Sequence, residues 1–319
     1  MKKNLYIAFG FLFFLQGYAQ EKKEEKMQNM LLDSLKKYEY EPLYQIEIFT
    51  NYAYRVKVND IPVKNNFTEF LKNTKFNINS AILYSGKQNL SIEIYPEYID
   101  KNKQKEYLDN QGTFKLIVSQ TAWRKDGGGQ EEPKIILEYE LPKENKHTGN
   151  TIDYAKLKSF TDSLSFEASV PYHLQGWTNG EVFKEEDSLQ LKAQVVDFYK
   201  KIINLYNTHN FKELYQLSKL QEYELAQYNY FTKDLIISNR EKFNNTLPKN
   251  RLKMLPLENY KLEFYANNRV LALVRVDNPF KYKSAIIGEK EDIYGNNKIV
   301  ILNKLLYRPI GSSQFQIIR

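Results

Sequence analysis

The sequence predicts a mostly β and α+β protein, with an N-terminal antiparallel β-sandwich followed by an α+β domain of helices and a curved antiparallel sheet. Three observations lead to this prediction. Apolar residues alternate with polar ones from about residue 43 to residue 141, recur at steps of three and four from about 188 to 236, and alternate again after residue 260. Strands with one apolar face are typical of sandwiches, and helices followed by strands are typical of α+β domains.

The predicted strands are separated by residues that favour turns. Alternation marks the segments 44–48, 52–58, 90–94, 114–118 and 135–141. Asn59-Asp60 is predicted to form a turn between two of them, and Asn267-Asn268 suits a type I′ hairpin, because Asn and Asp tolerate positive φ. Further strands are expected at 260–266, 270–274, 284–289, 298–307 and 314–318.

An amphipathic helix is predicted from about residue 188 to residue 207. Its apolar stripe consists of Leu191, Val195, Phe198, Ile202 and Leu205. Asp187 with Gln190 is predicted to cap its start, and Asn210 with Glu213 is predicted to cap a second helix. One or two more helices are expected before Pro248 and Pro256.

Two resemblances refine the fold. The segments 58–63, 77–80 and 86–94 together resemble immunoglobulin-like and sugar-binding-type β-sandwich domains, and this similarity implies a sandwich but not sugar binding. The order of elements over roughly 188–319 resembles the nuclear-transport-factor-2-like (cone) fold. That resemblance implies a conical cavity between the helices and the concave sheet. Its members include enzymes, ligand binders and scaffolds.

The first residues are typical of a secretory signal peptide. Lys2 and Lys3 precede an apolar stretch from Leu5 to Leu15, and Gly17 and Ala19 predict cleavage after Ala19. A retained anchor helix is the alternative, although the stretch is shorter than the roughly 20 residues of a membrane span. The domain plan is therefore a signal peptide at 1–19, a charged helical lead-in at 20–41, a sandwich domain at 42–184 and a cone-like domain at 185–319.

Composition narrows the partners and the compartment. The chain has no cysteine, so neither a disulfide nor a lipid-modified cysteine is expected. The formal net charge is +7, but the charges are interspersed rather than gathered in the basic stripe of a nucleic-acid binder. We expect an exported bacterial protein, periplasmic or secreted, with no nucleic-acid partner and no integral membrane span after signal removal.

The motifs of common enzymes are missing from the sequence. There is no thiol, no Gly-x-Ser-x-Gly elbow and no phosphate-binding loop, and the three histidines, His147, His173 and His209, are isolated. We therefore expect no metal and no cofactor, and name no catalytic residue. Asp197 would be a general base only if it faced the cone cavity, and its place beside the apolar stripe favours water instead. Whether the chain is an enzyme stays open, with the balance toward binding.

Aromatic loops are the best binding candidates. Trp123, Tyr172, His173 and Trp177 could form a platform for a sugar ring or a protein hot spot, and Tyr199 and Tyr206 could line the cone cavity. The alternative is that these rings only pack in the cores. The leading hypothesis is a non-enzymatic binding protein that recognises a protein or glycan of the cell envelope. The alternatives are an immunity-type toxin inhibitor and a small-molecule-binding or lyase-like enzyme that uses the cone cavity.

Overall fold

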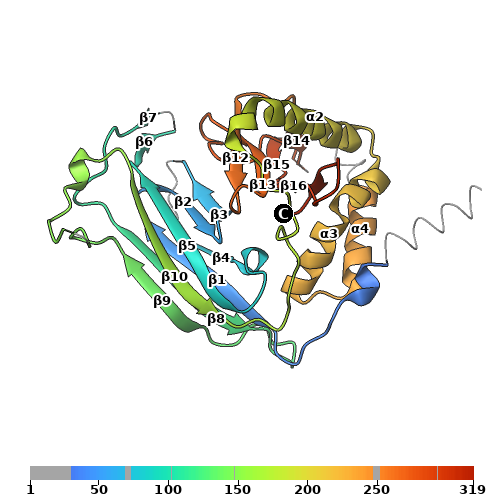
Figure 1. The fold of residues 1–319 in the computed structure, drawn as a ribbon, viewed down its shortest axis with the longest axis horizontal. Helices are drawn as coiled ribbons and strands as arrows, with labels where there is room; N and C mark the ends of the chain where they lie inside the picture. Colours follow the sequence, from blue (N-terminus) through green and yellow to red (C-terminus); the bar gives the residue numbers. More distant parts are fainter. Residues whose placement is uncertain (1–29, 69–72, 102, 147, 247–251, 293) are drawn as a thin grey trace, which may run out of the picture.

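The structure is a computed structural model that describes residues 30–68, 73–101, 103–146, 148–246, 252–292 and 294–319. The predicted signal peptide with its cleavage site after Ala19, residues 20–29 of the lead-in and His147 lie outside the described residues. The described chain forms β-strands, then helices and then further strands, as Figure 1 shows. The predicted order of elements and the α+β class are confirmed.

The N-terminal strands form two antiparallel four-stranded sheets, which we call the sandwich (Figure 1). One sheet has the order β4-β1-β8-β9, and the other has the order β10-β5-β2-β3. The strands of the first are β1 (Pro42–Thr50), β4 (Thr74–Asn77), β8 (Phe114–Ala122) and β9 (Lys134–Glu140). Those of the second are β2 (Ala53–Val58), β3 (Ile61–Asn66), β5 (Gly86–Tyr95) and β10 (Phe160–Ala168). A small ribbon of β6 (Tyr98–Asp100) and β7 (Lys103–Gln104) is attached.

The alternation in the sequence corresponds to the two faces of these strands. In β5, Leu90, Ile92 and Ile94 are fully buried, because their period of two places them all on the inner face. Asn59 and Asp60 adopt φ of 50° and 61° between β2 and β3, so the predicted turn is confirmed. Register is therefore set jointly by the apolar face and by turn chemistry.

Three α-helices follow the sandwich: α2 (Ser188–Asn207), α3 (Phe211–Asn229) and α4 (Lys233–Thr246). The boundaries of α2 match the prediction. Asn210 caps α3, since its Oδ1 accepts a hydrogen bond from the Glu213 amide at 3.3 Å. The capping prediction for Asp187 is wrong, because a 3₁₀ turn over Glu185–Asp187 leads into α2 and the Asp187 side chain makes no capping hydrogen bond.

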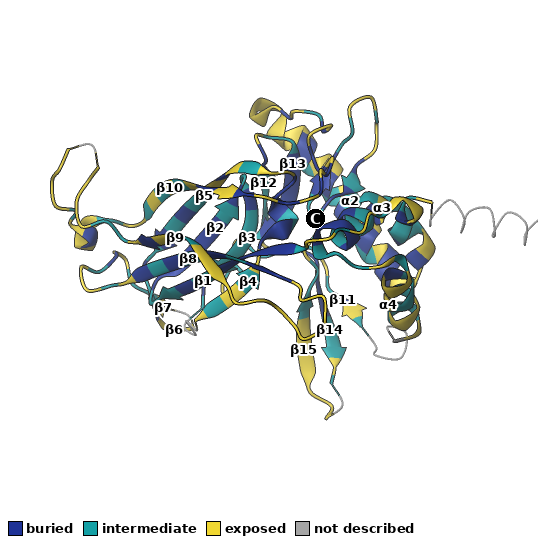
Figure 2. Cartoon of the chain, turned by 90° about the horizontal axis from the view of Figure 1, so that it is seen from below, coloured by how far each residue is buried: buried dark blue, intermediate teal, exposed yellow. Residues whose placement is uncertain are grey.

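The C-terminal strands form two sheets rather than the single curved sheet expected. One has the order β12-β13-β16-β17, and the other has the order β11-β14-β15. Their bounds are β11 (Lys253–Met254), β12 (Tyr260–Tyr265), β13 (Val270–Arg275), β14 (Ile287–Glu291), β15 (Asn297–Ile301), β16 (Leu306–Tyr307) and β17 (Gln316–Ile317). The expected strand 298–307 is interrupted between β15 and β16. The hairpin of β14 and β15 projects from the body (Figure 2).

Strand β13 is buried on both faces, and this joins the two parts of the molecule. Leu271 and Leu273 belong to the cluster formed by the apolar stripe of α2. Val270, Ala272 and Val274 point the other way and belong to the same apolar cluster as the sandwich interior. The C-terminal sheet therefore lies between α2 and the sandwich, and the dark buried band in Figure 2 is continuous across it.

A buried ion pair links α3 to the sandwich. The Glu224 side chain is 0% exposed, and its Oε2 accepts a hydrogen bond from Arg319 Nη1 at 2.6 Å. Its Oε1 accepts from the Gly176 amide at 2.6 Å, and Arg319 Nε donates to the Ser80 carbonyl at 2.6 Å. Two buried charges thus satisfy each other and also bind backbone groups next to the sandwich.

We expect Glu224→Gln to destabilise the fold by roughly 3 kcal/mol, because it leaves the buried Arg319 guanidinium without a counter-charge. Urea unfolding measures the change. Glu241→Gln, an exposed position on α4, is the matched control and should change stability by less than about 0.5 kcal/mol. Equal unfolding midpoints for the two variants would contradict the role given to the pair.

Candidate functional site

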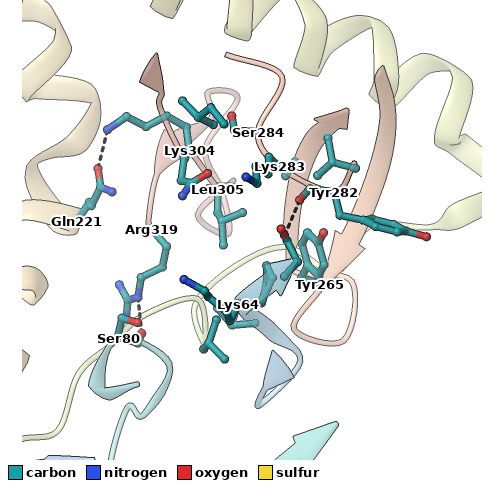
Figure 3. A pocket seen from close by; sticks show the side chains of 18 of the residues that line it. Lys64, Ser80, Gln221, Tyr265, Tyr282, Lys283, Ser284, Lys304, Leu305 and Arg319 are labelled. Carbon is teal, nitrogen blue, oxygen red and sulfur yellow. Dashed lines mark hydrogen bonds between the residues drawn. The ribbon is translucent and has the colours of Figure 1, made fainter. Parts of the chain in front are cut away.

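The candidate site is a pocket of about 560 Å³ between the sandwich and the C-terminal strands, which we call the basic pocket (Figure 3). A volume of this size is typical of small-molecule sites. From the sandwich it is lined by Ile61, Pro62, Val63, Lys64, Asn65 and Ser80. From the C-terminal half it is lined by Gln221, Tyr228, Tyr265, Ala272, Val274, Tyr282, Lys283, Ser284, Ile301, Asn303, Lys304, Leu305 and Arg319.

Four cations from both parts of the chain line the basic pocket. Lys64 comes from β3, Lys283 from the loop after β13, Lys304 from the segment before β16, and Arg319 follows β17 (Figure 3). Among the described residues that line the pocket, none is Asp or Glu. The charged side chains of the described lining are therefore all cations, and their electrostatic field favours an anion inside the pocket.

Lys304 is the most strongly perturbed of these cations. Its Nζ donates to the neutral Gln221 Oε1 at 3.3 Å, as the dashed line in Figure 3 marks. Burial lowers the pKa of Lys304 from its usual value to about 8, because removing an ammonium from water is costly when no carboxylate replaces the solvent. Burial also lowers the pKa of Lys283, and the neighbouring Lys64 ammonium lowers it further.

Arg319 is held rigidly at the pocket wall. Its side chain is 7% exposed, and its guanidinium lies over the rings of Trp177 and Tyr228 at 5.2 and 5.5 Å. Nε and Nη1 are bonded to Ser80 and Glu224, but the buried Nη2 makes no hydrogen bond to any residue in the described part of the chain. A buried N–H donor without a protein partner is costly and suits a ligand acceptor.

Tyrosines complete the polar wall of the pocket. Burial raises the pKa of Tyr228 and of Tyr265, so both hydroxyls stay neutral at physiological pH. Tyr282 lies between the Arg55 guanidinium, 3.8 Å from its ring centroid, and the Lys261 ammonium at 4.5 Å. Its carbonyl accepts from Asn65 Nδ2 at 2.9 Å, which ties β3 to the C-terminal half at the pocket edge.

Tyr199 and Tyr206 do not line this pocket. Tyr199 is fully buried, and its hydroxyl donates to the Lys304 carbonyl at 2.6 Å and accepts from the Leu273 amide at 3.1 Å. It therefore holds the Lys304 backbone from behind. Tyr206 is buried and packs edge-on against Phe243. The helix-facing side of β13, where the cone resemblance placed a cavity, is packed with apolar side chains.

The predicted aromatic platform is divided among several places. Tyr172 is buried, with its hydroxyl accepting from Asn79 Nδ2 at 3.2 Å, and Trp177 is 6% exposed beneath Arg319. His173 is exposed and stacks on Tyr84 at 5.3 Å. Trp123 is 38% exposed at the end of β8. Trp177 and Tyr172 support the wall around Arg319, whereas Trp123 lies elsewhere.

A second pocket of about 620 Å³ borders Trp177 and Tyr84. Lys57, Lys87 and Arg269 are the cations of its lining, and Lys57 is neutralised, since its Nζ lies 3.0 Å from Asp60 Oδ1 and 3.6 Å from Glu93 Oε1. Asn59 Nδ2 is likewise engaged, because it donates to Gln88 and to the Ala81 carbonyl. The basic pocket is the stronger candidate for an anion, because Asp60 lines the second pocket, whereas no Asp or Glu is among the described residues that line the basic pocket.

The described residues offer less support for a metal site, for acid–base catalysis by Asp197 or His209, or for a membrane-spanning helix. Within the described ranges, no group of three or more His, Asp or Glu side chains is arranged to hold a metal ion. Asp197 is exposed on α2, and His209 adopts φ of 53° in the turn between α2 and α3. None of the helices that the structure describes is both long and apolar enough to cross a bilayer.

Comparisons of the chain with protein-family models, with curated proteins and with solved structures found no match. The chemistry of the basic pocket is therefore the basis for inferring a function. Sequence reasoning missed Lys64, Lys283 and Lys304, because they lie far apart in the chain and belong to no motif. No local signal would have found them, since only the packing of β13 against the sandwich brings them to one cavity.

We expect Lys304→Met to stabilise the protein at pH 7 by up to about 3 kcal/mol, since it removes a buried ammonium whose pKa is lowered to about 8. The unfolded chain binds more protons than the folded chain between about pH 8 and pH 10.5, so wild-type stability should rise with pH in that window. Melting temperatures of both proteins at pH 7 and pH 9, in buffer free of phosphate and carboxylate, measure the effect.

The stabilising difference should be largest at pH 7 and smaller at pH 9, where much of the wild-type Lys304 is already neutral. Lys200→Met, at an exposed position on α2, is the control and should show no such pH dependence. A difference that stays constant from pH 7 to pH 9 would mean that Lys304 titrates normally.

Proposed function

We propose that the protein is an exported, non-enzymatic binding protein of the cell envelope, and that the basic pocket recognises an acidic glycan. The observation that carries this proposal is the convergence of four cations on a pocket whose described lining contains no acid. The ammonium of Lys304, which is bonded only to the neutral Gln221 amide among its described contacts, gains a counter-charge when an anion enters. Binding is then favoured because the anion supplies the counter-charge that the buried ammonium lacks in the free protein.

The remaining lining suits a sugar better than a bare inorganic anion. Asn65, Ser80, Ser284 and Asn303 offer amide and hydroxyl groups, and Tyr282 is a partly buried aromatic ring in the lining. Sugars present many hydroxyl groups and apolar ring faces, which such side chains can match. A carboxylate on the sugar would provide the charge that the lysines require. A hexuronic acid unit combines these features.

The other functional readings have less support. A lyase-like enzyme would need a general base in its cavity, and for that role the described lining of the basic pocket offers lysines and tyrosines but no Asp, Glu or His. We also propose that the C-terminal half is related to the cone fold. Its helices do precede its strands, but those strands are divided between two sheets.

We expect a digalacturonate to bind and a neutral galactose disaccharide to bind at least 10-fold more weakly, because only the former carries carboxylates. Replacing Lys64 or Lys283 by Gln should weaken digalacturonate binding by about 10-fold or more, the range expected for a lost charge-assisted hydrogen bond. Isothermal titration calorimetry measures both. Lys200→Gln is the control for net charge and should bind as the wild type does. Equal binding of the acidic and neutral sugars would exclude the proposal.

Binding of the acidic sugar should also weaken as pH rises from 7 to 9. The pKa of Lys304 is lowered to about 8, so the pocket loses positive charge within this range, whereas an ordinary surface lysine keeps its proton. Calorimetric titrations at pH 7, 8 and 9 test this. In Lys304→Arg, whose guanidinium stays protonated, the pH dependence should be flatter. An affinity that is unchanged across this range in the wild type would place the carboxylate away from Lys304.

A further inference from the structure

The amine of Lys304 is placed as a nucleophile rather than only as a charge. It lies in the wall of the basic pocket, where Nζ donates to the neutral amide of Gln221 at 3.3 Å. Lys283 and Lys64 line the same pocket. Ile301 and Leu305 supply apolar surface beside it. A lysine whose amine is desolvated is activated for attack on carbonyl carbon.

We propose that Lys304 captures its ligand by forming an imine with a carbonyl group, so that the ligand of the basic pocket is a carboxylate that also carries an aldehyde or ketone. This inference rests on the proposed function, because the anion-binding cations must hold the carboxylate. The open-chain form of a reducing-end hexuronic acid has both groups, and so does a small 2-oxo acid.

The covalent step balances without any further reagent. The lone pair of the neutral Lys304 Nζ attacks the carbonyl carbon, and the carbonyl π electrons move to oxygen to give a carbinolamine. One N–H proton moves to this oxygen to give the hydroxyl group, which then leaves as water with the second N–H proton while the nitrogen lone pair forms the C=N bond. Nothing is oxidised or reduced, and the reaction is reversible by water. The step therefore amounts to reversible covalent binding.

The surroundings supply each requirement of this step. Lys64 and Lys283, from opposite walls, provide the charge that holds a carboxylate (Figure 3). The Tyr199 hydroxyl donates to the Lys304 backbone carbonyl at 2.6 Å and fixes the backbone from which the side chain starts, and Gln221 holds the amine. With its pKa lowered to about 8, Lys304 at pH 7 has a neutral fraction about 300-fold larger than that of an ordinary lysine.

The test is reductive trapping of the purified wild-type protein at pH 7 with sodium cyanoborohydride. One arm uses glyoxylate and the other galacturonate, which distinguishes a small oxo acid from a reducing sugar acid. Peptide mapping by mass spectrometry then locates the reduced adduct. We expect Lys304 to be modified at least 10-fold faster than exposed lysines such as Lys125 and Lys156, which are 76% and 82% exposed. Glucose, which lacks the carboxylate, should show no preference for Lys304.

Two variants separate this mechanism from simple accessibility. Gln221→Glu places a carboxylate at the amine, which should raise the pKa of Lys304 and move the pH midpoint of trapping upward. Lys304→Arg keeps the positive charge but cannot form an imine, so noncovalent digalacturonate binding should persist while trapping at this position is lost. Trapping should rise with pH through about 8, whereas noncovalent binding falls, because the two need opposite protonation states.

The outcomes distinguish this inference from the proposed function. Preferential labelling of Lys304 supports both. Labels distributed according to exposure, with calorimetric anion binding retained, overturn the imine and leave the binding function intact. Absence of both selective labelling and anion binding overturns both proposals. Because the mapping uses the wild-type chain, the result does not depend on whether any variant folds.

Discussion

The buried pair of Glu224 and Arg319 is the interaction on which the arrangement of the molecule depends. A carboxylate that is 0% exposed is tolerable only when charge and hydrogen bonds replace water, and here Arg319 and the Gly176 amide do so. The same guanidinium binds the Ser80 carbonyl of the sandwich. The two side chains together thus connect α3, the loop before α2 and the sandwich. The pair contributes geometric specificity as well as stability.

This anchoring also places the pocket residues. The Leu305 amide donates to the Arg319 carbonyl at 2.7 Å, and the Ile318 amide donates to the Leu305 carbonyl at 2.9 Å. Lys304, which precedes Leu305, is therefore fixed from one side by the strand that carries Arg319 and from the other by Tyr199. Burial lowers the pKa of Lys304, so its positive charge is disfavoured in the free protein. We infer that stability has been given up at this position for binding.

The sequence was informative where the signal is local. Alternation at 90–94 identified β5, the stripe from Leu191 to Leu205 identified α2, and Asn59-Asp60 identified a turn, because each depends on neighbouring residues. The continuous apolar run 270–274 contained a further signal, since a strand apolar on both sides is buried on both faces. The pocket gave no such signal. Its lysines line one pocket only because β13 packs against α2 on one face and against the sandwich on the other. Most of the predicted aromatic residues pack in the apolar cores or behind the pocket wall.

A crystal structure of the protein with digalacturonate at pH 7 tests the central claim most directly. Our account predicts that one carboxylate of the sugar lies in the basic pocket, within hydrogen-bond distance of at least two of the side chains of Lys64, Lys283 and Lys304. A sugar bound instead in the second pocket beside Trp177, or a sugar in the basic pocket with its carboxylates directed to solvent, would contradict it.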